Sequence, residues 1–140
     1  MGLVREPALF RCAVAYVAVT DLALLSDPGW SGLAGHEDVL AELVRIVGDP
    51  STDSARFAAT SPLRQAAKIT APVLLAFGGE DRRVPIVHGV RMRDALEAGG
   101  TPVTWLMYPH EGHGFNKDEN RYDFYRRVGA FLERHLATPR

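Results

Sequence analysis

Three short apolar runs divide the chain, and segments with helical periodicity lie between and after them. The runs span residues 10–19, 72–77 and 103–108. A nearly continuous apolar run of strand length is typical of a strand buried on both faces of a parallel sheet that helices cover. Glycine and proline follow the two later runs and predict turns there. We therefore expect three strands.

Apolar residues at helical spacing predict helices over residues 36–47, 53–59, 86–98 and 122–136. Ser61 followed by Pro62 predicts a further turn of helix, with Ser61 as its cap. Residues 22–69 are then a helical excursion between the first two strands, and we expect this excursion to form one wall of a cleft. The order of elements predicts an α/β fold with three parallel strands and flanking helices.

The first predicted strand is buried in character, yet nothing before it can supply a neighbour on its other side. Its outer edge would be long, flat and apolar, which native domains usually avoid. The 140 residues are enough for one domain and not for two. We therefore expect residues 1–140 to form a single partial domain, the back half of a sheet that lacks its N-terminal strands. Self-association through the exposed strand edge is expected as well.

Composition narrows the classes of function. With 46% hydrophobic and 24% charged residues, the chain has the composition of a globular protein. A net charge of −1 gives no electrostatic basis for binding nucleic acid or an anionic membrane, and no apolar run reaches the ~20 residues that span a bilayer. The single cysteine, Cys12, excludes an internal disulfide and fits a reducing compartment, so a cytoplasmic location is expected.

Two residues with catalytic potential follow the two later strands. Asp81 comes after the second strand and His113 after the third. Parallel strands joined by a helix bring their following loops to the same edge of a sheet, so the two side chains can meet there. A histidine acts as a general base when a carboxylate accepts its Nδ1 proton. The alternatives are that Asp81 only forms a turn and that His113 is only solvated.

Four stretches of sequence resemble the prolyl oligopeptidase family of serine peptidases. Residues 78–85 (GGEDRRVP) resemble its G-x-x-D-x-R-V-P segment, and residues 108–115 (YPHEGHGF) resemble its Y-P-x-E-G-H-G-F segment. Residues 60–63 (TSPL) resemble the T/W-S-P-L segment of the family before the strand that precedes the aspartate. Residues 10–13 with 20–21 resemble the strand that follows the nucleophile helix in the acylaminoacyl-peptidase and dipeptidyl-peptidase branch. The resemblance implies the C-terminal half of an α/β-hydrolase fold. It also implies a peptide substrate, a propeller domain elsewhere in the protein, and a Ser-Asp-His triad with Asp81 as acid and His113 as base.

The nucleophile of such a triad is missing from the sequence. The elbow that presents it has the pattern G-x-S-x-G, and none of the serines, Ser26, Ser31, Ser51, Ser54 and Ser61, matches it. Residues 29–32 (GWSG) come nearest, but no strand precedes them. We therefore expect the chain to be the C-terminal part of a catalytic domain that is inactive alone and needs the missing N-terminal half as its partner.

Other residues receive structural interpretations. His110 and His113 lack the helical spacing of zinc enzymes, so neither a metal nor another cofactor is expected. Trp105 and Tyr108 are expected in the core. Glu111 is expected to tether the loop of His113.

Two expectations concern the surroundings of the triad. An arginine after Asp81, Arg82 or Arg83, is expected to bond carboxylates or carbonyls. A substrate pocket is expected around Tyr16, Val17 and residues 21–35.

Two alternatives to the peptidase remain open from the sequence. Dienelactone-hydrolase-like esterases also carry a D-x-x-V-P and an H-G-F segment, although the residues before His113 favour the peptidase. The other alternative is a remnant without catalytic activity that folds only with a partner chain and serves as a binding module or has no function.

Overall fold

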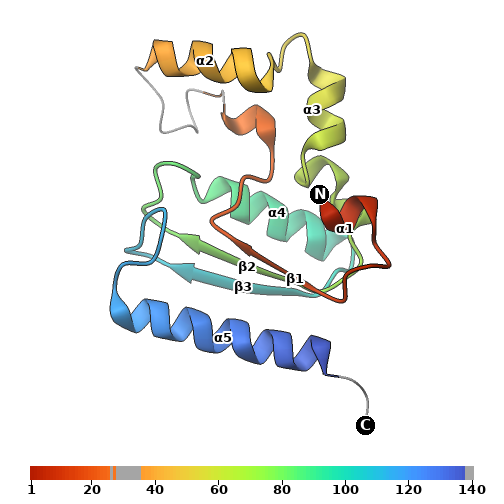
Figure 1. The fold of residues 1–140 in the computed structure, drawn as a ribbon, viewed down its shortest axis with the longest axis vertical. Helices are drawn as coiled ribbons and strands as arrows, with labels where there is room; N and C mark the ends of the chain where they lie inside the picture. Colours follow the sequence, from red (N-terminus) through yellow and green to blue (C-terminus); the bar gives the residue numbers. More distant parts are fainter. Residues whose placement is uncertain (26, 28–35, 138–140) are drawn as a thin grey trace.

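In the part of the chain that the structure describes, the sheet has three strands, all parallel. A computed structural model describes residues 1–25, 27 and 36–137. Within these ranges the strand order is β1-β2-β3, with β1 at Ala13–Tyr16, β2 at Val73–Gly78 and β3 at Val103–Tyr108. Helix α4 (Val87–Ala98) lies on one face of the sheet and α5 (Asp118–Leu136) on the other (Figure 1). The predicted α/β arrangement of three parallel strands with flanking helices is confirmed.

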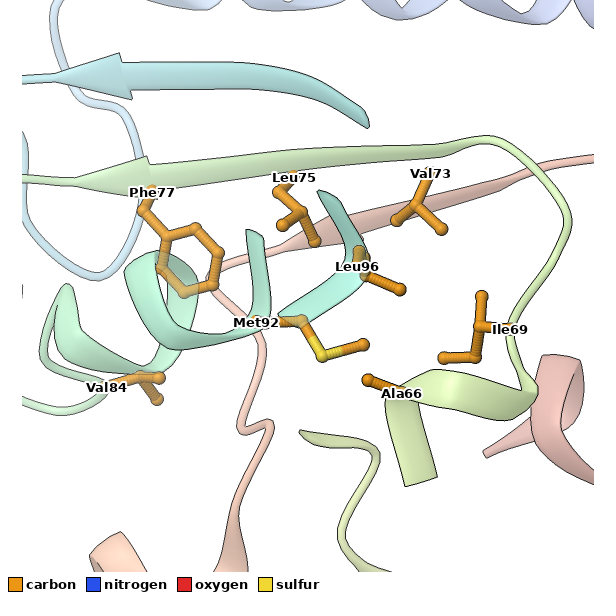
Figure 2. Packing of buried hydrophobic residues seen from close by; sticks show 8 residues of the cluster. All are labelled: Ala66, Ile69, Val73, Leu75, Phe77, Val84, Met92 and Leu96. Atoms are coloured by element: carbon orange, nitrogen blue, oxygen red, sulfur yellow. The ribbon is translucent and has the colours of Figure 1, made fainter. Parts of the chain in front are cut away.

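Strand β2 is the centre of the core because both of its neighbours are strands and both of its faces are covered. Side chains alternate along a strand, so Val73, Leu75 and Phe77 point toward α4, where Met92 and Leu96 pack against them (Figure 2). Leu74 and Ala76 point the other way and join the cluster beneath α5. All six residues of β2 are buried, which fixes the loop that follows the strand.

In its described part, the connection from β1 to β2 is largely helical, as predicted. It contains η1 (Leu22–Leu25), α2 (Glu37–Val47), α3 (Ser54–Thr60) and η2 (Leu63–Lys68). The last of these packs against α4, α3 and the short N-terminal helix α1 (Gly2–Arg5), on the α4 side of the sheet (Figure 1).

The prediction that Ser61 caps a helix is wrong. Helix η2 begins after Pro62 and has no side-chain cap. The hydroxyl oxygen of Ser61 instead accepts a hydrogen bond from the amide of Leu22 at 2.9 Å. A hydrogen bond from Leu22, 39 positions away, therefore takes the place of a local cap on helix η2.

The first strand is shorter and more exposed than its apolar sequence predicts. Only Ala13–Tyr16 form β1, instead of residues 10–19, and alternate side chains are exposed, with Val14 at 36% and Tyr16 at 38%. The prediction of burial on both faces is wrong because β1 lies at the edge of the sheet. Val17 then ends the strand with φ = +43°, a left-handed conformation that a β-branched residue rarely adopts.

The last helix begins one turn before the predicted start. Asp118 and Glu119 occupy its first turn, where their carboxylates interact favourably with the helix dipole. Because these residues are polar, the apolar periodicity did not include this turn. Across the described ranges, no helix combines the length and the apolar character that a membrane crossing requires.

Candidate active site

The loops after β2 and β3 cross each other at the carboxyl edge of the sheet. The amide of Gly79 donates to the carbonyl of Tyr108 at 2.9 Å, and the amide of Glu80 donates to the carbonyl of Glu111 at 2.9 Å. A Cβ atom built on Gly78 would lie 2.3 Å from the carbonyl oxygen of Glu111. The residues at the end of β2 must therefore lack side chains for the two loops to touch.

The crossing brings Asp81 and His113 together. Nδ1 of His113 lies 2.9 Å from Oδ2 of Asp81, and the Asp81 side chain is 0% exposed while that of His113 is 33% exposed. Since an ionised carboxylate only accepts hydrogen bonds, Nδ1 carries the proton, and in the neutral ring Nε2 then keeps its lone pair. The predicted contact between these two groups is confirmed.

The second oxygen of Asp81 fixes the orientation of its carboxylate. Oδ1 accepts the amides of Arg83 and Val84 at 2.8 and 2.9 Å, within the turn that follows β2. The backbone of Arg83, rather than its guanidinium group, therefore makes the contact with the acid. With one oxygen held by two amides, the other oxygen is left facing the imidazole ring of His113.

The loop that carries His113 is held by the buried carboxylate of Glu111. This carboxylate accepts the amides of Asn116 at 2.7 Å and Lys117 at 3.0 Å, and the side-chain amide of Asn120 at 2.7 Å. Burial raises the pKa of Glu111, but these three hydrogen bonds outweigh it, so that the pKa lies below its ordinary value. The predicted tether is confirmed.

Of the two aromatic residues of β3, Tyr108 is buried in the core as predicted, and Trp105 is partly buried against it. Trp105 stacks on Phe77 with 5.7 Å between ring centroids. The hydroxyl of Tyr108 donates to Asp123 on α5 at 2.9 Å, and burial together with this bond raises the pKa of Tyr108 to about 12. The third strand is thereby tied to the helix that covers it.

His110 lies apart from the acid–base pair. Its Nδ1 is 3.1 Å from Oε1 of Glu80, and both side chains are largely exposed. In the part of the chain that the structure describes, no three His, Cys, Asp or Glu side chains come together as a metal site.

Three serines lie in the described ranges, and hydrogen bonds occupy the hydroxyl groups of two of them. Ser51 donates to Asp49 at 2.6 Å, and the buried Ser61 accepts the amide of Leu22. Ser54 begins helix α3. Ser26 and residues 29–32, the nearest sequence match to a nucleophile elbow, lie outside the described residues.

A buried histidine that the sequence did not single out joins α4 to the loop that follows β1. His88 on α4 is 0% exposed, and its Nδ1 accepts the amide of Thr20 at 3.2 Å. Burial lowers the pKa of His88, which keeps Nδ1 free to accept. Its position four residues before the buried Met92 is the signal that places it on the buried stripe of the helix.

These features identify the chain as part of an α/β-hydrolase: a parallel sheet with an aspartate and a hydrogen-bonded histidine on successive strand-end loops. The pattern of the prolyl oligopeptidase family matches residues 1–139. The chain belongs to this family of serine peptidases.

Known relatives agree with this assignment. Dipeptidyl aminopeptidase BIII of Pseudoxanthomonas mexicana is 34% identical over an alignment of 140 positions, and the match covers 96% of this chain and 19% of that protein. Acylamino-acid-releasing enzyme of Homo sapiens is 29% identical, over 96% of this chain and 18% of that enzyme. The acylaminoacyl peptidase of Pyrococcus horikoshii shares the fold with a TM-score of 0.82 and 22% identity, over 99% of this chain and 22% of its own length.

The chain spans about a fifth of the length of the curated relatives it matches. The family match also favours the peptidase over the esterase alternative.

Proposed function

We propose that this chain supplies the acid and the base of a serine peptidase that hydrolyses peptide bonds, with Asp81 as the triad acid and His113 as the base. The observation that carries the proposal is the 2.9 Å hydrogen bond between Nδ1 of His113 and Oδ2 of Asp81. This bond leaves Nε2 as the proton acceptor, and a third of the His113 side chain is open to an incoming group.

The reaction assigns one step to each of the two side chains. Nε2 of His113 takes the proton of a serine hydroxyl as the hydroxyl attacks the peptide carbonyl, and then gives that proton to the leaving amine. The buried Asp81 holds the ring in the required tautomer and stabilises the imidazolium that forms. The nucleophile and the oxyanion hole come, in this proposal, from an N-terminal half of the domain, and a propeller domain completes the protein.

Two further features belong to the proposal. The protein acts in the cytoplasm, which agrees with its single cysteine, Cys12. The outer edge of β1 is the place where the N-terminal half pairs with this chain, and in its absence two copies associate there.

The test restores a segment that bears G-x-S-x-G, by extending the reading frame upstream or by mixing in the separate half. Dipeptidyl and acylaminoacyl substrates then report the activity. In the restored enzyme, His113→Ala lowers kcat by several orders of magnitude, as loss of a triad base does. The matched control is His110→Ala, three residues away in an exposed pair with Glu80, and it retains most of the activity.

A fluorophosphonate probe separates the proposal from its alternatives. The probe is expected to label a serine in the restored segment and not the 140-residue chain alone. Labelling of Ser31 in the chain alone, abolished by His113→Ala, would replace the proposal with a complete hydrolase of another type. A restored protein that neither reacts with the probe nor cleaves any substrate would support a remnant without catalytic activity.

A further inference from the structure

The hydroxyl of Tyr16 reaches across the sheet edge to the loop of His113. Tyr16 is the last residue of β1, and its hydroxyl oxygen accepts the amide of Phe115 at 2.8 Å, a contact between residues 99 positions apart. The ring is packed on both sides of this contact, with centroids 4.8 Å from Phe115 and 4.8 Å from Phe124. The bond therefore joins β1 to a residue two positions beyond His113.

The amides after His113 show why this bond matters. The amide of Gly114 donates to the carbonyl of Gly112 at 2.9 Å, which closes a three-residue turn with His113 at its centre. The amides of Asn116 and Lys117 donate to Glu111 within the same loop. Among these four consecutive amides, all within the described residues, only the amide of Phe115 donates to a group outside the loop, the hydroxyl of Tyr16 on β1.

The residue directly after His113 is a glycine in a left-handed conformation. Gly114 has φ = +131°, and glycine moves between many backbone conformations at little cost. The hydroxyl of Tyr16 lies 3.8 Å from the place of a Cβ on Gly114, so it is close to the residue directly beside the histidine. Val17, the residue after Tyr16, has a left-handed conformation that ends β1. Backbone strain of this kind concentrates at functional sites.

We propose that Tyr16 is a positioning residue for His113. By accepting the amide of Phe115, its hydroxyl fixes the turn in the orientation that keeps Nδ1 of His113 on Asp81. The structural effect stands independently of catalysis, and its consequence for turnover rests on the proposed function.

Tyr16→Phe tests the inference because it removes the hydroxyl and keeps the ring packing. In the ¹⁵N-labelled 140-residue chain, exchange of the Phe115 amide is expected to become roughly tenfold faster. The signal of the His113 Nδ1 proton is expected to broaden or disappear. The matched control is Tyr108→Phe, which loses a tyrosine hydroxyl bound to α5 instead of the loop, and it leaves both signals unchanged.

Different outcomes separate this inference from the proposed function. A His113 signal and a Phe115 exchange rate that Tyr16→Phe does not change would overturn the positioning role. A Nδ1 proton signal that survives in Asp81→Ala, which removes the acceptor, would instead contradict the acid–base pair. If Tyr16→Phe does not fold, the wild-type chain decides, because a Phe115 amide that exchanges as fast as exposed amides excludes the bond.

In the restored enzyme, Tyr16→Phe is expected to lower kcat roughly ten- to a hundredfold and to change KM little. A change confined to KM would assign Tyr16 to substrate binding instead and overturn the inference.

Discussion

Gly78 and Glu111 lie so close that a single methyl group would separate the two loops of the candidate site. A Cβ on Gly78 would be 2.3 Å from the carbonyl oxygen of Glu111 and 2.4 Å from that of Gly112. Side-chain and backbone atoms do not approach to such distances without displacement. The contact between Asp81 and His113 thus depends on Gly78, which lies at the end of β2 and not at the tip of either loop.

Gly78→Ala is expected to destabilise the chain by about 1–3 kcal/mol, the usual cost of overpacking, and to weaken the Nδ1 proton signal of His113. Urea unfolding and proton NMR measure the two effects. Gly112→Ala is the matched control, since a Cβ there meets no atom within 4 Å. Equal effects of the two substitutions would show that the loops do not cross as described.

Gly129→Ala is expected to stabilise the chain. Gly129 lies inside α5, where an added Cβ meets nothing within 4 Å, and alanine in a helix interior is favoured over glycine by about 0.5–1 kcal/mol. Gly89→Ala in α4 serves as the contrast, because its Cβ would lie 2.5 Å from the ring of Phe77. Thermal melts of the two variants should shift in opposite directions, and a shared direction would contradict the packing of these helices.

Glu111→Gln is expected to cost about 1–3 kcal/mol of stability near neutral pH, because the glutamine amide group would meet an N–H donor where the carboxylate accepted one. The pKa of Glu111 is lowered in the folded chain: burial raises it, and the bonds from Asn120, Asn116 and Lys117 outweigh burial. A carboxyl group of this kind contributes its full stability above its unfolded-state pKa of about 4.3 and loses it as the pH falls through its folded-state pKa.

The stability gap, which is the difference in free energy of unfolding between wild type and Glu111→Gln, should therefore narrow as the pH falls from 7 to below about 4. Urea unfolding at both pH values measures the gap. Glu97→Gln, on the exposed side of α4, should show little change at either pH. A gap that is constant across this range would mean that the Glu111 carboxylate does not hold the loop.

The sequence predicts the parts of the fold that depend on local periodicity. Strand β3 has the predicted bounds, Val103–Tyr108, because proline residues and a sharp change in polarity flank it. The bounds of β1 were not predictable, since its run of valine and alanine continues past the strand end and only the left-handed Val17 terminates it. Periodicity also cannot tell an edge strand from a central one.

In the candidate site, too, local sequence locates some residues, whereas contacts between distant residues could not be predicted. Asp81 and His113 follow strand ends, and the partners of Glu111 lie at most nine positions away along the chain, so local sequence locates all three. The contribution of Tyr16 depends on a partner 99 residues away, and no local pattern predicts it. The same holds for the bond from Thr20 to His88, which joins residues 68 positions apart.

The outer edge of β1 is expected to make the isolated chain associate. The amides of Ala13 and Val17 donate to the backbone on the β2 side, so Val14 and Tyr16 present their backbone groups to the other side, where the described residues supply no strand. An apolar groove of about 300 Å³, lined by Val14 among others, lies next to this edge. Unpaired backbone groups beside exposed apolar surface favour edge-to-edge pairing.

Val14→Lys should reduce this association, because a charge on an edge strand disfavours pairing with another strand. The sedimentation coefficient of the wild-type chain is expected to rise with concentration, and that of Val14→Lys to stay near the monomer value. Val39→Lys, an equally drastic change on the exposed α2 surface, controls for added charge and should associate as the wild type does. A wild-type chain that sediments as a single monomer and melts in one two-state transition would show that β1 needs no neighbour, and that the sheet is stable with the three strands described.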